Sequence, residues 1–117
     1  MIGIMSLDAV ARRAERLEGV RRTDVRIGDW VIVETRNSSY WILGLGDGRY
    51  SVCGGWFDRR GLSPATITIN GCTWGGSAIL TDLIAGPGLF LEFGNRVVTT
   101  RIRQVRLIRA EGPPLFN

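Results

Sequence analysis

The sequence predicts one small, mainly β domain, built as an antiparallel barrel or a sandwich with a single N-terminal helix. Its 117 residues suit one domain. Its 16 glycines against 4 prolines, with short runs of valine, isoleucine and threonine between them, are typical of short strands joined by tight turns. From residue 25 the apolar residues alternate with a period of two. We therefore expect a single domain over residues 1–117, with a helix at 6–18, β structure at 25–109 and a tail at 110–117.

The predicted helix is amphipathic and begins after Ser6, whose hydroxyl can cap the first turn. Apolar residues recur at intervals of three and four, which places them on one helix face. They are Leu7, Val10, Ala11, Ala14 and Leu17. Gly19 follows the last turn, where glycine commonly ends a helix. Residues 20–24 are then expected to form a connector.

A three-stranded meander is expected over residues 29–53. The last two of its strands are separated by Asp47-Gly48, a dipeptide that favours the type I′ turn of a tight β-hairpin. The strands are predicted at 30–35, 40–45 and 49–53.

The start of this meander resembles the opening of many small β barrels, including SH3-like and nucleic-acid-binding ones. The resemblance rests on the Gly28-Asp29 turn and the alternating valines that follow it. Any barrel or sandwich can use such a turn into a strand, so the resemblance implies a fold and not a family.

The second half of the chain gives weaker strand signals. Between residues 54 and 76 only 66–69 is predicted as a strand, because paired glycines and Asn70-Gly71 interrupt the rest. Three further segments have β composition, at 77–80, 89–93 and 97–109.

The chain has few of the side chains on which catalysis usually depends. It contains no histidine and no lysine, which removes the usual general base, the common nucleophile pairs and Schiff-base chemistry. Two cysteines, Cys53 and Cys72, cannot complete a four-ligand zinc site alone. We therefore expect no enzyme activity, no catalytic residue, no metal, no cofactor and no small-molecule substrate.

The expected location is the cytoplasm. The first residues lack the basic and apolar regions of a secretory signal. No apolar run approaches the roughly 20 residues of a membrane helix, and two distant cysteines suit free thiols in a reducing compartment. No membrane role is expected.

The meander is apolar on both of its faces. An antiparallel sheet with one wet face should alternate apolar and polar residues, but here Val31, Val33 and Ile42 can fill a core while a second apolar set faces the other way. One helix covers only part of such a face, and large exposed apolar patches usually mark interfaces. We therefore expect a non-catalytic structural or interaction module that self-associates into a homo-oligomer. The self-association residues would be Trp30, Ile32, Trp41 and Leu43.

The alternative is a nucleic-acid-binding small β-barrel protein. The net charge is +4 and every basic residue is arginine, interleaved with aromatic residues of the kind that stack on bases. In a strand, Arg101 and Arg103 share one face while Arg106 lies on the other. The coding preference of the source genome would explain the arginine bias equally well. The candidate nucleic-acid-binding residues are Arg96, Arg101, Arg103, Arg106 and Arg109.

Overall fold

The structure is a computed structural model, and it describes residues 19–110. The helix predicted at 6–18 lies outside the described residues, as does the predicted tail beyond residue 110. In chain order, the described elements are β1 (Val20–Arg21), the 3₁₀ turn η1 (Arg22–Asp24), β2 (Trp30–Thr35), β3 (Ser39–Gly46), β4 (Arg49–Gly54), α2 (Gly55–Arg59), β5 (Ala65–Thr73), β6 (Ile79–Leu80), β7 (Leu83–Ala85), β8 (Phe90–Phe93) and β9 (Ile102–Ile108).

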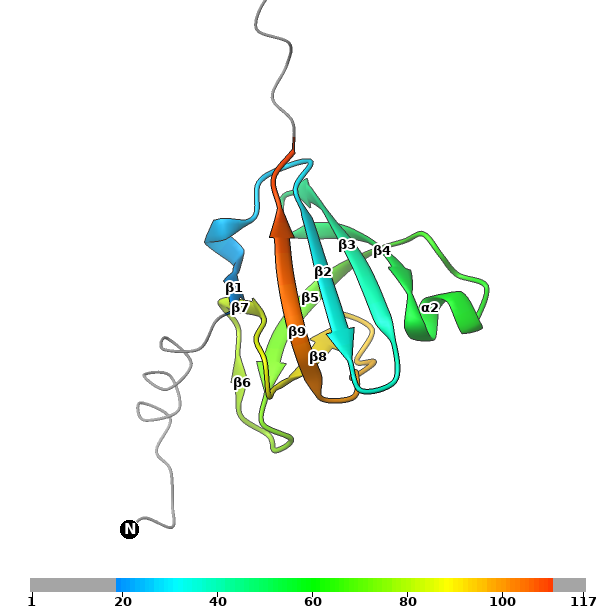
Figure 1. Cartoon of the computed structure of the whole chain (residues 1–117). Coiled ribbons are helices and arrows are strands. Elements are labelled where there is room, and N and C mark those ends of the chain that lie inside the picture. Colours follow the sequence, from blue (N-terminus) through cyan, green and yellow to red (C-terminus); the bar gives the residue numbers. More distant parts are fainter. Residues whose placement is uncertain (1–18, 111–117) are drawn as a thin grey trace, which may run out of the picture.

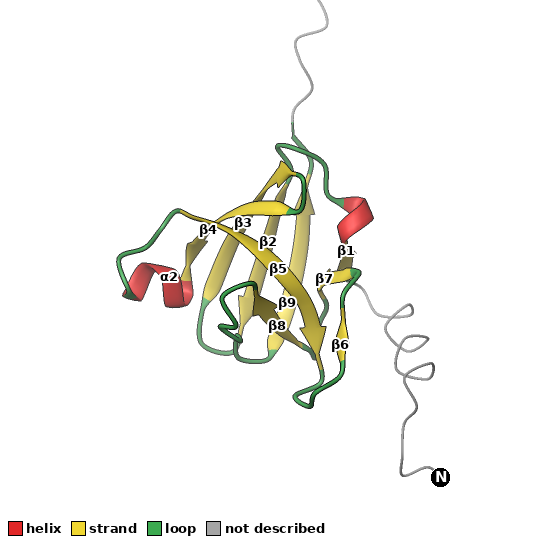
Figure 2. Ribbon diagram, turned by 180° about the vertical axis from the view of Figure 1, so that it is seen from behind, coloured by secondary structure: helices red, strands yellow, loops and turns green. Residues whose placement is uncertain are grey.

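The main sheet is antiparallel and curls into a half-barrel (Figure 1). Its strand order is β6-β5-β4-β3-β2-β9, and β8 adds to it by pairing with β5. Seen from behind, β5 crosses the β2, β3 and β9 strands diagonally (Figure 2). The mainly β, antiparallel fold predicted from the sequence is thus confirmed, while the sheet forms a half-barrel.

The predicted meander is confirmed as β2, β3 and β4. Val31 lies opposite Ile42, and Ile42 lies opposite Val52. Between β3 and β4 the backbone φ is 55° at Asp47 and 73° at Gly48, which is the pair of positive values that a type I′ turn requires. The Asp-Gly dipeptide therefore predicts the turn, while a register shift between Gly44 and Gly46 alters the pairing of β3 with β4 next to it.

Several strands differ from the sequence-based expectation. β7 was not predicted, and the strand predicted at 97–109 begins only at Ile102, as β9. The connector at residues 20–24 contains β1, which pairs with β7 through Val20 and Ala85. The strand predicted at 66–69 continues as β5 to Thr73, through the glycine that was expected to interrupt it. Gly71 has a φ of 141° at a register shift, and a Cβ there would collide with the carbonyl oxygen of Leu80. Glycine is needed here for a β-bulge and a close backbone approach, so it does not end the strand.

The short helix α2 follows β4 directly and was not predicted. Gly54 and Gly55 turn the chain with φ values of 102° and 44°, and the Tyr40 ring lies where a Cβ of Gly55 would be. The Tyr40 hydroxyl accepts a hydrogen bond of 3.1 Å from the Trp56 backbone N–H. The helix thereby buries Phe57 in the core.

The core lies inside the half-barrel. The inward side chains of β2 and β3 meet side chains from β5, β7 and β8 there. Aromatic rings form its centre, with the Phe57 and Phe93 ring centroids 4.9 Å apart and edge-on, and those of Tyr40 and Phe93 5.4 Å apart. Val31, Val33 and Ile42 are fully buried in this core, as alternation predicted.

Candidate functional site

A second apolar layer lies on the opposite side of the sheet. We call this side the outer face; it is the surface of β9, β2, β3 and β4 turned away from β5 and β8, and it faces the reader in Figure 1. Strand alternation places on it the side chains that neighbour the core positions in sequence. Its apolar residues on β2, β3 and β9 are Trp30, Ile32, Trp41, Leu43 and Ile108.

The strand register brings these residues into two rows. Trp30 lies between Leu43 and Ile108, and Ile32 lies between Trp41 and Arg106. The Trp30 and Trp41 rings meet edge-on, with centroids 6.2 Å apart and an interplanar angle of 77°. The four residues predicted for self-association thus form one continuous patch.

Exposure differs sharply within this patch. Ile32 is only 3% exposed although it lies outside the core cluster, so its neighbours on the outer face shield it. Trp41 and Ile108, by contrast, are 47% and 46% exposed. The patch therefore combines a buried isoleucine with an exposed tryptophan, and it presents an apolar surface to solvent.

Charged groups border the apolar patch. Glu34 lies opposite Gln104 at one end of β2, and Arg106 lies beside Ile32. Neither Glu34 nor Arg106 forms an ion pair within residues 19–110. The rim of the patch therefore carries both signs of charge.

The five arginines of the predicted basic cluster do not form one surface. Arg106 lies on the outer face, and Arg109 forms an ion pair with the buried Asp29. Arg96 follows β8 in a turn, with a φ of 68°. Only Arg101 and Arg103 lie together, at the start of β9.

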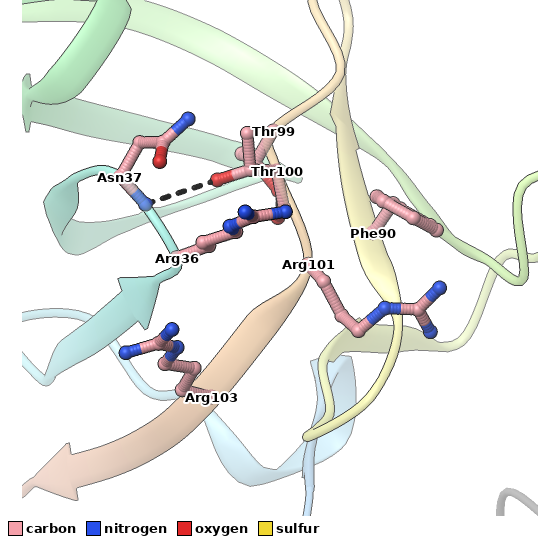
Figure 3. A pocket seen from close by; sticks show the side chains of 7 residues that line it. All are labelled: Arg36, Asn37, Phe90, Thr99, Thr100, Arg101 and Arg103. Atoms are coloured by element: carbon pink, nitrogen blue, oxygen red, sulfur yellow. Dashed lines mark hydrogen bonds between the residues drawn. The ribbon is translucent and has the colours of Figure 1, made fainter.

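These two arginines line a pocket of about 590 Å³ (Figure 3). The pocket joins the turn between β2 and β3 to the loop that enters β9, with β8 beside them. Sequence reasoning found Arg101 and Arg103 but missed Arg36 and Asn37 of the β2–β3 turn, because the register of β2 and β9 is what brings the two segments together. The full lining is Arg36, Asn37, Phe90, Thr99, Thr100, Arg101 and Arg103.

Backbone and hydroxyl hydrogen bonds fix the two sides of the pocket to each other. The Arg36 N–H donates to the Arg101 carbonyl oxygen at 3.0 Å. The Thr100 hydroxyl donates to Oγ1 of Thr35 at 2.8 Å, and the Asn37 N–H reaches both hydroxyl oxygens at 3.3 Å. The Asn37–Thr100 hydrogen bond is the dashed line in Figure 3. The pocket walls are therefore held in place by backbone and threonine hydroxyl hydrogen bonds.

The three arginines of the pocket differ in how firmly they are held. The Arg101 guanidinium lies 4.8 Å from the Phe90 ring centre and donates to the Gly88 carbonyl oxygen at 2.8 Å, and Figure 3 shows it turned toward Phe90. Among the described residues, Arg36 and Arg103 have no side-chain hydrogen bond and no ion pair. The lining contains no carboxylate, so this pocket is electropositive.

Residues 19–110 offer neither a metal site nor a membrane-spanning helix. They contain no group of three or more histidine, cysteine, aspartate or glutamate side chains placed to share a metal ion. None of the helices described there is both long and apolar enough to cross a bilayer. Comparison with known proteins gave no matching family model, no matching curated protein and no matching solved structure.

Proposed function

We propose that this protein is a non-catalytic interaction module that self-associates into a homo-oligomer through its outer face. The supporting observation is the exposure of Trp41, at 47%, in an apolar layer on a sheet whose other face is already occupied by the core. A large exposed aromatic side chain next to a second tryptophan is typical of the anchors that dominate interface energies.

A second copy of the chain suits this face because the face can complement itself. In a two-fold interface the same patch meets itself, so each residue on one copy needs its complement elsewhere on the same patch. The outer face offers an apolar centre, a carboxylate at Glu34 and a guanidinium at Arg106. Glu34 of one copy can pair with Arg106 of the other while the tryptophans meet at the centre. Stable interfaces bury about 800 Å² per partner, so the contact would extend from the apolar centre onto this polar rim.

The test is solution mass against concentration for the full chain. Wild-type protein should gain mass across the micromolar range in sedimentation velocity, and the double variant Trp30→Gln, Trp41→Gln should remain monomeric with a folded β spectrum. The matched control is Val98→Gln, since Val98 is 48% exposed but lies between β8 and β9. A control that dissociates as readily as the double variant would contradict the assignment of this face.

A chemical probe lies on the same face. Cys53 is opposite Trp41 in the register and is partly exposed. Its alkylation should slow as protein concentration rises, because self-association would cover it. A wild-type protein that stays monomeric, with an alkylation rate independent of concentration, would refute the proposal; residues outside the described range or another protein would then have to cover the patch.

Nucleic-acid binding is the second candidate function, and one observation favours it. The pocket at the start of β9 is lined by three arginines and an aromatic ring, and no carboxylate is among its lining residues. This candidate uses a different surface from the outer face, so the two proposals can succeed or fail independently.

A further inference from the structure

The geometry points to a binding site for the phosphates of a single-stranded nucleic acid in the pocket between the β2–β3 turn and the start of β9. Arg36 and Arg103 would bind the phosphates, and Arg101 on Phe90 would support a base. This inference rests on the second candidate function and names its site, its ligand class and the role of each side chain.

Charge supports an anionic ligand. Three arginines line a pocket whose lining contains no carboxylate, and two of them, Arg36 and Arg103, have no side-chain hydrogen bond or ion pair among the described residues. Guanidinium groups bind phosphate through paired N–H donors. Several positive charges around one cavity raise the local positive potential, which attracts an anion. A bound anion then reduces the repulsion between these charges.

Hydrogen bonds within the protein already fix the walls of the pocket before a ligand binds. The Arg36–Arg101 backbone hydrogen bond and the Thr35–Thr100 hydroxyl pair hold the two wall segments at a fixed separation. Arg101 is already oriented by Phe90 and by the Gly88 carbonyl oxygen. Only Arg36 and Arg103 would lose side-chain freedom on binding, which lowers the entropic cost.

A nucleic-acid strand fits these observations better than a lone phosphate. Arg36 and Arg103 are exposed, and an isolated exposed charge pair contributes little free energy. A strand engages several arginines at once and releases counterions at each phosphate. The guanidinium of Arg101 on Phe90 offers a planar surface, and unpaired bases stack on such planes. Bases inside a duplex are already stacked, so a single strand is the better ligand.

The test compares two charge-matched variants of the full chain. The pocket variant is Arg36→Gln, Arg103→Gln, and the control is Arg26→Gln, Arg49→Gln, whose arginines are exposed near the opposite end of β2 and β3. Binding of a labelled oligothymidine is followed by fluorescence anisotropy over a series of salt concentrations. We expect the pocket variant to lose at least tenfold in affinity, with a salt slope lower by about 0.7 for each phosphate that the variant no longer binds. The control should lose less than threefold.

Each result decides a different part of the inference. No binding of the oligonucleotide by wild-type protein at low salt would overturn both the site and the second candidate function. Equal losses in the two variants would overturn the site alone and leave binding by overall charge. Inorganic phosphate that displaces the oligonucleotide at comparable concentration, or a duplex that binds more tightly than the single strand, would overturn the strand assignment. Matching melting temperatures of the two variants show that a loss of binding is not a loss of fold.

Discussion

The Nη1 atom of Arg109 lies 2.8 Å from Oδ2 of Asp29, a buried carboxylate at the start of β2. Asp29 also accepts backbone hydrogen bonds from Ala110 at 2.8 Å and from Arg26 at 2.9 Å. These main-chain donors, then the Arg109 guanidinium, lower the pKa of Asp29 to about 2. One carboxylate thus ties the end of β9 to the turn that begins β2.

The first prediction concerns pH. The pKa of Asp29 is about 2 in the folded protein, against an ordinary value of 3.8, so folding favours the ionised form. Its contribution should be complete above about pH 4 and should disappear as the pH falls toward 2. Asp29→Asn should lower the melting temperature at neutral pH. Between about pH 4 and pH 2, the melting temperature of this variant should fall less than that of the wild type. The control is Asp47→Asn, in an exposed turn where asparagine accepts a positive φ. If the melting temperature of Asp29→Asn falls with decreasing pH as steeply as that of the wild type, this role of Asp29 is contradicted.

The second prediction concerns the turn between β3 and β4. A Cβ at Gly48 would meet no atom within 4 Å, but its φ is 73°. Gly48→Val should therefore destabilise the protein through the backbone alone, by more than about 1 kcal/mol, since β-branched residues avoid this region. Gly48→Asn, which tolerates positive φ, should cost less. Equal denaturant midpoints for the two variants would show that backbone conformation does not decide this turn.

The third prediction compares two glycines that share a positive φ. At Gly54 a Cβ would collide with the Ser39 carbonyl oxygen, whereas at Gly61 it would meet nothing within 4 Å. Gly61→Ala should cost about 1–2 kcal/mol from its backbone conformation. Gly54→Ala should cost more, because β3 and β4 must also move apart. Chemical unfolding measures both values, and a smaller cost at Gly54 would refute the close-approach argument.

The fourth prediction concerns the cysteines. Burial raises the pKa of the Cys72 thiol to about 12, and its Sγ donates to the Ile84 carbonyl oxygen at 3.2 Å. Since the thiolate is the reactive form, a maleimide at about pH 8 should label the folded chain once, at Cys53, and the denatured chain twice. Mass spectrometry counts the labels. In Cys53→Ser the folded chain should remain unlabelled, and rapid labelling of that variant would show that the core around Cys72 opens.

Sequence patterns predicted local structure well where one physical rule dominated. Alternation separated Val31 and Val33 from Trp30 and Ile32, and Asp47-Gly48 fixed the hairpin. At Gly71 the prediction was wrong because glycine serves both turns and bulges, and only the close approach of Leu80 tells them apart. Local rules cannot supply that contact, because it joins two segments that meet only in the fold.

The same limit applies to the pocket. Composition drew attention to Arg101 and Arg103, but Arg36 is distant in the sequence and belongs to what looks like an ordinary turn. The pairing of Thr35 with Ile102 brings these arginines together. Strand register, including the bulge next to that pair, was therefore the missing information.

The pairing of β2 with β9 also constrains how the chain is made. Trp30 lies opposite Ile108, so the meander is synthesised long before its neighbouring strand exists. During that interval the nascent chain presents the free edge of β2 beside the two tryptophans, a combination prone to wrong pairing. The pairing of β2 with β9 can form only after β9 emerges, and contacts between segments so distant in sequence form slowly. A ribosome that stalls before β9 therefore leaves an aggregation-prone sheet edge exposed to its neighbours.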